Sequence, residues 1–357
     1  ITTAHITRNH AYMIYDVLLA LDSKFQPKPQ MAEFAVSDDK LTYTFTLRDG
    51  LKFHDGAAVT AEDCVASLQR WAKKDAGGQL IMDRTASLTA KDARTIVWTL
   101  KQPFAPMLDT LAKQSALPPF IMPKRVAEGP ADKALTDYTG SGPFKFVTAE
   151  FQPGVSVTYV KNPDYKPRAE PADNMAGGKV VKVDKVKWVV MPDVMTAANA
   201  LMSGEIDYVE QIQLDMLPLL QAEPKVKVET REPLGYQTIA RFNFKHPPFD
   251  NKKLRQAALK AISSKPVLQT MIGNEKYYTV CGAVMGCGTK FGSEAGAESI
   301  IKGNGVDEAK KLLKEGGYDG TPVVLMQPTD VVTLSTQPVV VAQQLRDAGF
   351  KVDLQPM

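Results

Sequence analysis

The chain has 357 residues, of which 44% are hydrophobic and 23% are charged, and this length predicts two or three domains rather than one ordinary core. Its 43 basic and 40 acidic residues are spread along the sequence and leave a net charge of +3, which argues against a nucleic-acid partner. No apolar run reaches the roughly 20 residues that cross a bilayer, and the start lacks the order of a signal peptide. We therefore expect a soluble chain from which any targeting segment has been removed.

The first third of the chain has the pattern of a small α+β unit. Alternating apolar residues predict a half-buried strand at Thr42–Leu47 and a second short strand at 51–53, with turns at 48–50 and 54–56. Thr60 and Asp63 have the spacing of a capping box and predict a helix that presents Val65, Leu68 and Trp71.

The same unit continues to about residue 138. Ile96, Trp98 and Leu100 alternate as a further strand, and prolines between 103 and 123 predict an irregular stretch.

Beyond residue 140 the pattern changes to alternating strands and helices, which is typical of α/β proteins. The predicted strands are 155–160, 186–190, 206–209, 225–230, 236–243, 322–326 and 350–354. The predicted helices are 194–203 closed by Gly204, one capped by Asp250 that presents Leu254, Ala258 and Ile262, 307–315, and 337–348 closed by Gly349.

The three cysteines suggest different roles. Cys281 and Cys287 stand in a glycine-bearing stretch with five residues between them, which favours a small disulfide-closed loop over two free thiols and fits zinc spacing badly. A disulfide would indicate an oxidising compartment. Cys64 is interpreted as a small buried hydrophobe.

Six segments in order resemble the family 5 periplasmic solute-binding proteins, which include dipeptide, oligopeptide and nickel binders. They are LTYTFTLRDGLKFHDGAAVTAEDCVASLQRW at 41–71, TGSGPFKFV at 139–147, KNPDYKP at 161–167, MSGEIDYV at 202–209, FNFKHPPFDNKKLRQAALKAI at 242–262 and VDEAKKLLKEGGYDG at 306–320. One such motif alone is weak, whereas six in family order are specific.

The resemblance implies an α/β, periplasmic-binding-protein-like fold of type II, cluster C: two lobes with an extra inserted small α+β domain. Lobe one would comprise 1–30 and 139–245, which ends in a hinge strand, the inserted domain 31–138, and lobe two 246–357. Family members begin with an earlier strand and continue well past Met357. We therefore expect lobe two to be incomplete here, and further chain to cover the strand at 350–354 and supply the second hinge strand.

The resemblance also indicates where a ligand would bind. It places Asn9, His10 and Tyr12 where lobe one meets ligand in several members, with a helix start capped by Asn9 as the alternative. Tyr236, Gln237 and Thr238 open the predicted hinge strand, where family members commonly touch ligand. The alternative is an ordinary strand with an exposed aromatic residue.

Other polar groups fit structural interpretations better. His54 and Asp55 are predicted to form a turn before Gly56, not a catalytic pair. The glycines at 139–142 form a turn and not a phosphate loop, and Lys252, Lys253 and Arg255 form a solvated helix face. The four histidines, His5, His10, His54 and His246, are scattered, so no metal site is predicted.

The predicted function is therefore the substrate-binding component of an ABC importer, which captures a peptide or peptide-like solute between two lobes. No cofactor is expected, and the partners are the ligand and membrane permease subunits. The predicted state is a periplasmic monomer. The alternative is a ligand-sensing module that signals through a partner without transport. An enzyme would need a nucleophile with a base, or a cofactor motif, and neither is found.

Overall fold

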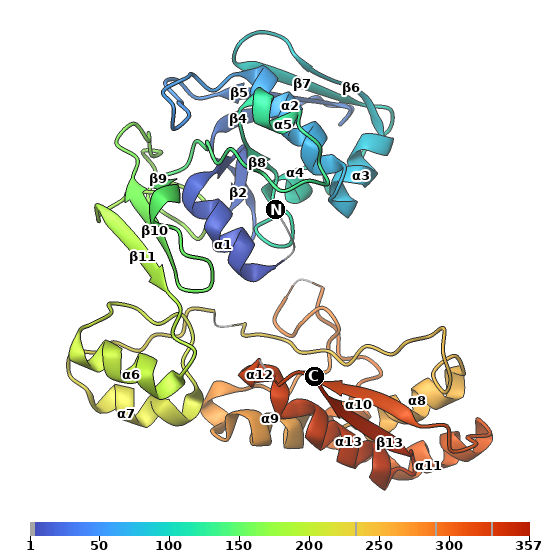
Figure 1. Ribbon diagram of the computed structural model, residues 1–357. Helices are drawn as coiled ribbons and strands as arrows, with labels where there is room; N and C mark the ends of the chain where they lie inside the picture. Colours follow the sequence, from blue (N-terminus) through green and yellow to red (C-terminus); the bar gives the residue numbers. More distant parts are fainter. Residues whose placement is uncertain (1–3, 233, 290, 330) are drawn as a thin grey trace. The chain divides into compact units, whose positions relative to one another are not determined.

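The computed structural model describes residues 4–232, 234–289, 291–329 and 331–357. The chain divides into two compact units, Ile1–Val190 and Met191–Met357 (Figure 1). Among the described residues the first unit has two hydrophobic cores and the second unit has one, so each unit is described by itself. The lobe scheme with its boundary at 245/246 stays a prediction.

The first unit contains a four-stranded antiparallel sheet. Its strand order is β4-β5-β7-β6, formed by β4 Ala32–Val36, β5 Thr42–Leu47, β7 Thr95–Leu100 and β6 Thr85–Ala90. Tyr43 pairs with Trp98 and Phe45 with Ile96, all four being buried. The predicted alternation in β5 and β7 is thus confirmed, because period-two side chains share one face.

Helix α2, Ala61–Ala72, covers strands β6 and β7 (Figure 1). Its predicted capping box is present: Thr60 accepts from the Asp63 amide and the Asp63 side chain accepts from the Thr60 amide. Leu68 and Trp71 are buried in the same core as the sheet residues. The amphipathic pattern read from the sequence is therefore the pattern that packs α2.

The predicted strand at 51–53 is wrong. Among the described residues, this segment makes a single bridge between Lys52 and Ala58, because the turn at 54–56 reverses the chain before a ladder can extend. Leu51 and Phe53 are nevertheless buried, so the apolar pattern reported burial rather than pairing.

A second sheet in this unit has the order β11-β10-β9 and is antiparallel. It consists of β9 Phe144–Phe146, β10 Ser156–Lys161 and β11 Lys185–Val189. Helix α1, His5–Ile14, packs beside β9, and Tyr159 of β10 is fully buried in the second core.

The remaining elements of the first unit are short, as the prolines between 103 and 123 predicted for their stretch. They are β1 Asp16–Val17, β2 Leu19–Leu21, β3 Pro27–Pro29, β8 Phe120–Ile121, α3 Ala76–Asp83, α4 Met107–Ala112, α5 Lys124–Ala127 and η1 Thr148–Glu150. Strand β1 pairs with β8, and β2 with β3.

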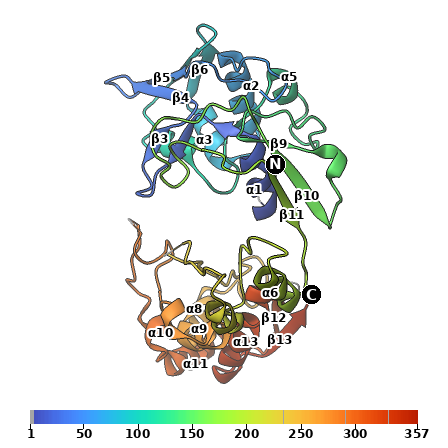
Figure 2. The same cartoon turned by 90° about the vertical axis from the view of Figure 1, so that its left-hand side faces the viewer.

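Helices outnumber strands in the second unit, whose described residues form one parallel pair of strands (Figure 2). Its elements are α6 Val194–Ser203, η2 Leu214–Met216, α7 Leu217–Ala222, α8 Lys252–Ala261, α9 Ser264–Ile272, η3 Glu275–Tyr277, α10 Glu298–Lys302, α11 Val306–Glu315, β12 Val323–Gln327, α12 Val332–Ser335, α13 Gln337–Asp347 and β13 Val352–Pro356. Helix α13 connects the two strands and packs on both, and Leu345 and Phe350 lie in the core.

Helix ends in this unit match the sequence closely. Helix α6 ends at Gly204, whose φ of 78° is left-handed, a conformation that glycine adopts without steric cost. Helix α8 is capped by Asn251, one residue after the predicted Asp250, and the Asn251 side chain accepts from the Lys253 amide.

Three predicted strands of this unit, 206–209, 225–230 and 236–243, are wrong. The described residues in these segments form no strand ladder. A strand needs a neighbouring backbone to accept and donate its hydrogen bonds, and no described segment pairs with them. The apolar pattern by itself does not supply that neighbour.

Candidate ligand-binding site

Helix α1 carries the first three predicted ligand residues, Asn9, His10 and Tyr12, all half-buried. The helix begins at His5, so Asn9 lies inside it, and the alternative that Asn9 caps the helix is wrong. Buried Ala11 and Ile14 hold α1 in the second core of the first unit.

The His10 side chain is held in an aromatic cluster. Its Nδ1 atom lies 2.7 Å from the Tyr159 hydroxyl, and its ring meets the Phe146 ring edge-on with centroids 5.1 Å apart. Burial lowers the pKa of His10 below its ordinary value, since the apolar surroundings disfavour the imidazolium. The surroundings of His10 therefore favour its neutral form.

Tyr12 is used for packing. Its hydroxyl donates to the Gln114 carbonyl at 3.3 Å, and its ring contacts Phe120 in a T-shaped arrangement with centroids 4.8 Å apart. Burial raises the pKa of Tyr12. These contacts align the helix on strand β8.

The other three predicted ligand residues lie in an extended segment of the second unit. Tyr236 is 81% exposed, and Gln211 Nε2 donates to its hydroxyl at 3.4 Å. Gln237 donates from Nε2 to the Ala283 carbonyl at 2.6 Å, and Thr238 Oγ1 accepts from Gln337 at 3.3 Å. All three residues are exposed.

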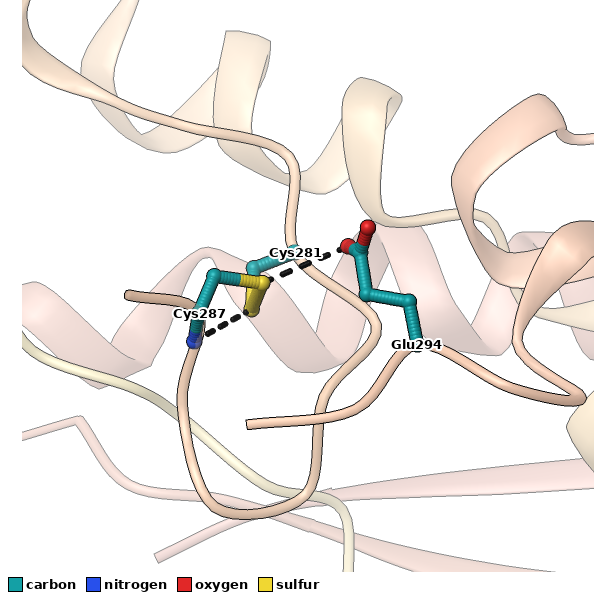
Figure 3. Close-up of side chains that lie close together, drawn as sticks. All are labelled: Cys281, Cys287 and Glu294. Carbon is teal, nitrogen blue, oxygen red and sulfur yellow. Dashed lines mark hydrogen bonds between the residues drawn. A yellow bond between two sulfur atoms is a disulfide. The ribbon is translucent and has the colours of Figure 1, made fainter. Parts of the chain in front are cut away.

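The predicted disulfide between Cys281 and Cys287 is confirmed, with Cα atoms 5.9 Å apart (Figure 3). Glu294 lies beside it: its Oε1 atom accepts from the Gly282 amide at 3.2 Å and is 3.3 Å from Cys287 Sγ. Because a disulfide sulfur carries no proton, the second distance is a contact. Cys64 is fully buried, as predicted, and burial raises the pKa of its thiol.

The two cysteines and Glu294 form the kind of cluster that could hold a metal ion, since their ligand atoms lie within 4.8 Å of one another. Metals bind thiolates, and these sulfurs are bonded to each other. In the disulfide form these three side chains therefore stabilise the loop and offer no thiolate to a metal.

The turn at His54 and Asp55 is confirmed, and it has a second role that the sequence did not indicate. The Gly140 amide donates to His54 Nδ1 at 3.2 Å, and Nε2 donates to the Gly142 carbonyl at 3.3 Å. Asp55 accepts from the Ala57 amide at 3.1 Å and pairs with Arg125 at 3.0 Å. The His54 imidazole therefore joins its turn to the backbone at 140–142.

The glycines of 139–142 serve close backbone packing. A Cβ atom at Gly140 or Gly142 would collide with the backbone of Ile14 at the end of α1. Only glycine fits at such an approach, and the chain bends at 142–143 directly before strand β9.

The basic face at 252–255 is only partly a solvated face. Lys253 pairs with Glu315 at 3.0 Å. Arg255 instead donates to the Phe249 carbonyl at 2.6 Å, and its guanidinium lies 4.1 Å from the centre of the Phe244 ring. Arg255 thus links the first turn of α8 to the loop that precedes the helix.

Two hollows among the described residues are lined by none of the six predicted ligand residues. One of about 350 Å³ is in the second unit and is lined by Ser263, Lys265, Gln269, Lys302, Gln344 and Asp347, among others. The predicted residues are divided between the units: three lie on α1 and three on the segment at 236–238. A shared cleft stays a prediction.

Comparison with known proteins decides the family. The model of the bacterial extracellular solute-binding proteins, family 5 Middle, matches residues 26–357. The chain belongs to this family. Its members are solute-binding proteins of transporters and not a class of enzymes, and the resemblance and fold class predicted from the six motifs are confirmed.

Two relatives and one solved structure illustrate the likeness. A probable peptide ABC transporter periplasmic-binding protein of Sinorhizobium fredii is 42% identical over 99% of this chain and 67% of its own length. The dipeptide-binding protein DppE of Bacillus subtilis is 28% identical over 91% of this chain and 60% of its own. MoaA of A. tumefaciens R10, solved with mannopinic acid, has a TM-score of 0.78 at 25% identity and covers 100% of this chain and 69% of its own.

These relatives are longer than the chain, which spans 60% to 67% of the two sequence relatives. No helix among the described residues is both long and apolar enough to cross a membrane.

Proposed function

We propose that this chain acts in a periplasmic substrate-binding protein that captures a peptide or peptide-like solute and delivers it to an ABC permease. The observation that carries the proposal is the 42% identity over 99% of the chain to a probable periplasmic peptide-binding protein. The protein makes or breaks no bond. It uses the free energy of ligand binding to change its shape.

The proposed site is formed by Asn9 and His10 on α1, steadied by Tyr12, and by Tyr236 with its neighbours Gln237 and Thr238. A neutral His10 offers Nε2 as a hydrogen-bonding atom, and Tyr236 offers an exposed ring and hydroxyl. A few polar groups on a rigid frame, with aromatic surface beside them, are typical of a small-molecule site.

Capture works by a shift of population. The open form exposes both lobe faces, and the ligand bridges them and favours closure by its differential affinity for the closed state. For a peptide, hydrogen bonds to the backbone provide affinity across many sequences, while side-chain pockets adjust it.

Native mass spectrometry of the purified protein, before and after mild denaturation, identifies the bound solute. A peptide supports the proposal in full. Because MoaA was solved with mannopinic acid, a solute like mannopinic acid is the alternative that this measurement distinguishes.

The role of Tyr236 is tested by Tyr236→Ala, with Tyr208→Ala as a matched control because Tyr208 is 71% exposed in the same unit. We expect the Kd for the identified ligand to rise about tenfold or more for Tyr236→Ala, in line with the weight of aromatic anchors in binding. The control should stay within about twofold. Equal effects of both substitutions would remove Tyr236 from the site.

Transport is separated from sensing by reconstitution. If the protein is the binding component of an importer and acts as a periplasmic monomer, it should stimulate ligand uptake by its permease and ATPase in proteoliposomes. A ligand-sensing module would bind the same solute and give no uptake. The monomer is checked by light scattering with and without ligand.

A further inference from the structure

We propose that the disulfide-closed loop Cys281–Cys287 is a specificity-determining element of the ligand site, where Val284 and Met285 receive an apolar side chain of a bound peptide. The inference rests on the proposed function and names the ligand feature that this part of the site would select.

The loop is rigid at its base. The disulfide joins its ends, and the Cys287 amide donates to Cys281 Sγ at 3.1 Å (Figure 3). Glu294 accepts from the Gly282 amide. Gly282 lies so close to Ala297 that a Cβ atom there would collide with the Ala297 side chain. A loop held in this way loses little entropy when it binds a ligand.

The tip of this rigid loop is apolar and exposed. Ala283 is buried, whereas the next two side chains, Val284 and Met285, are 82% and 66% exposed. Thr289 Oγ1 donates to the Met285 carbonyl at 2.9 Å and fixes the backbone behind them. Apolar side chains displayed by a braced loop are a feature of binding surfaces.

The loop is tied to the predicted ligand segment. Gln237 donates to the Ala283 carbonyl at 2.6 Å, directly before the exposed pair. The side chain of Leu234 also lies against Gly288, 3.3 Å from where a Cβ atom would stand. The exposed pair therefore adjoins the segment that carries Tyr236, and the two are positioned together.

A peptide side chain is the occupant that fits these contacts. Two neighbouring apolar side chains contribute free energy to a partner that removes them from water, at about 25 cal/mol per Å² buried. Backbone and termini of a peptide gain nothing there, whereas a leucine or phenylalanine side chain does. The loop would thus select among peptides and leave their common backbone recognition unchanged.

The experiment compares Ala-Leu-Ala with trialanine by calorimetry on the full protein, unsubstituted and with Val284→Ser plus Met285→Ser. We expect the unsubstituted protein to bind Ala-Leu-Ala about tenfold more tightly, and the double variant to lose that preference while its Kd for trialanine changes by less than about twofold. Val180→Ser plus Val183→Ser is the matched control, because both valines are exposed in the first unit.

Cys281→Ser plus Cys287→Ser tests the brace. The preference of this variant for Ala-Leu-Ala should fall as well. If it does not fold, the result for Val284→Ser plus Met285→Ser, the tip variant, is the one that tests the inference. A preference that survives in the tip variant, or an equal loss for both peptides, overturns the inference. Normal peptide binding with lost uptake would instead place the loop at the permease. If neither peptide binds the unsubstituted protein, the proposed peptide function fails.

Discussion

Asp16 is a carboxylate held inside the first unit, with only 1% of its surface exposed. Lys179 Nζ lies 2.8 Å from one oxygen, and the Tyr165 hydroxyl donates to the other at 2.8 Å. A buried charge is tolerated when it is paired and hydrogen-bonded. These contacts attach the loops at 165 and 179 to strand β1.

Lys179→Met should therefore lower the free energy of unfolding of the first unit by about 3 kcal/mol, because it leaves the Asp16 charge buried without its counterion. Lys124→Met is the control: its partner Glu62 lies at 2.9 Å but both side chains are exposed, and such surface pairs contribute less than about 1 kcal/mol. Urea denaturation measures both. Similar losses for the two variants would mean that the Asp16 pair is not special.

We expect His54 to make the first unit sensitive to acid. Burial is the main cause that lowers the pKa of its ring to about 4, while its hydrogen bond to the Gly142 carbonyl opposes the shift. Of the charged groups around the ring, Lys145 also lowers the pKa of His54 and Asp55 raises it. The unfolded ring titrates near the ordinary value of about 6.5, so between these values the unfolded chain binds a proton that the native ring does not.

The free energy of unfolding should therefore fall by up to about 3 kcal/mol as the pH falls from about 6.5 to about 4. Protection of the Gly140 amide against hydrogen exchange, measured relative to the intrinsic rate at each pH, should fall over the same range, because this amide donates to His54 Nδ1. His54→Gln should flatten this pH dependence, while His246→Gln in the other unit should leave it intact. An unchanged slope in His54→Gln would assign the acid sensitivity elsewhere.

At the scale of elements, the start of α2 illustrates a local rule that determines structure. Thr60 Oγ1 accepts from the Asp63 amide at 3.3 Å, and Asp63 Oδ2 accepts from the Thr60 amide at 2.9 Å. Both bonds satisfy donors that the first turn of a helix leaves unpaired.

Thr60→Ala should destabilise the first unit by about 1 kcal/mol, seen as a shift of its urea midpoint at constant slope. Thr60→Ser keeps the hydroxyl and should recover most of that loss. A loss in Thr60→Ser equal to that in Thr60→Ala would indicate that the Thr60 methyl group, rather than its hydroxyl, stabilises the helix.

At the scale of the whole molecule, the proposed function requires that the ligand changes the distribution of shapes. We expect the radius of gyration measured by small-angle X-ray scattering to decrease when the identified ligand is added, because the closed state is the one with more ligand contacts. Tyr236→Ala should need more ligand for the same decrease. A radius that does not change at saturating ligand would contradict capture by closure.

Local patterns in the sequence determined much of this protein. Alternation predicted β5 and β7, the capping box predicted α2, Gly204 marked the end of α6, and the spacing of Cys281 and Cys287 favoured the disulfide. The six ordered motifs indicated the family, which the match over 26–357 confirms. All of these depend on residues close together in the chain or on a comparison of short segments.

Tertiary structure alone decided which polar groups are still available to a ligand. His10 Nδ1 is hydrogen-bonded to the hydroxyl of Tyr159, 149 residues away, and Gln237 Nε2 to the carbonyl of Ala283, 46 residues away. The apolar segments at 206–209, 225–230 and 236–243 have the pattern of strands and form no ladder among the described residues. The reason is the same in each case: a hydrogen bond needs a partner, and where that partner lies far along the chain, only folding brings it within reach.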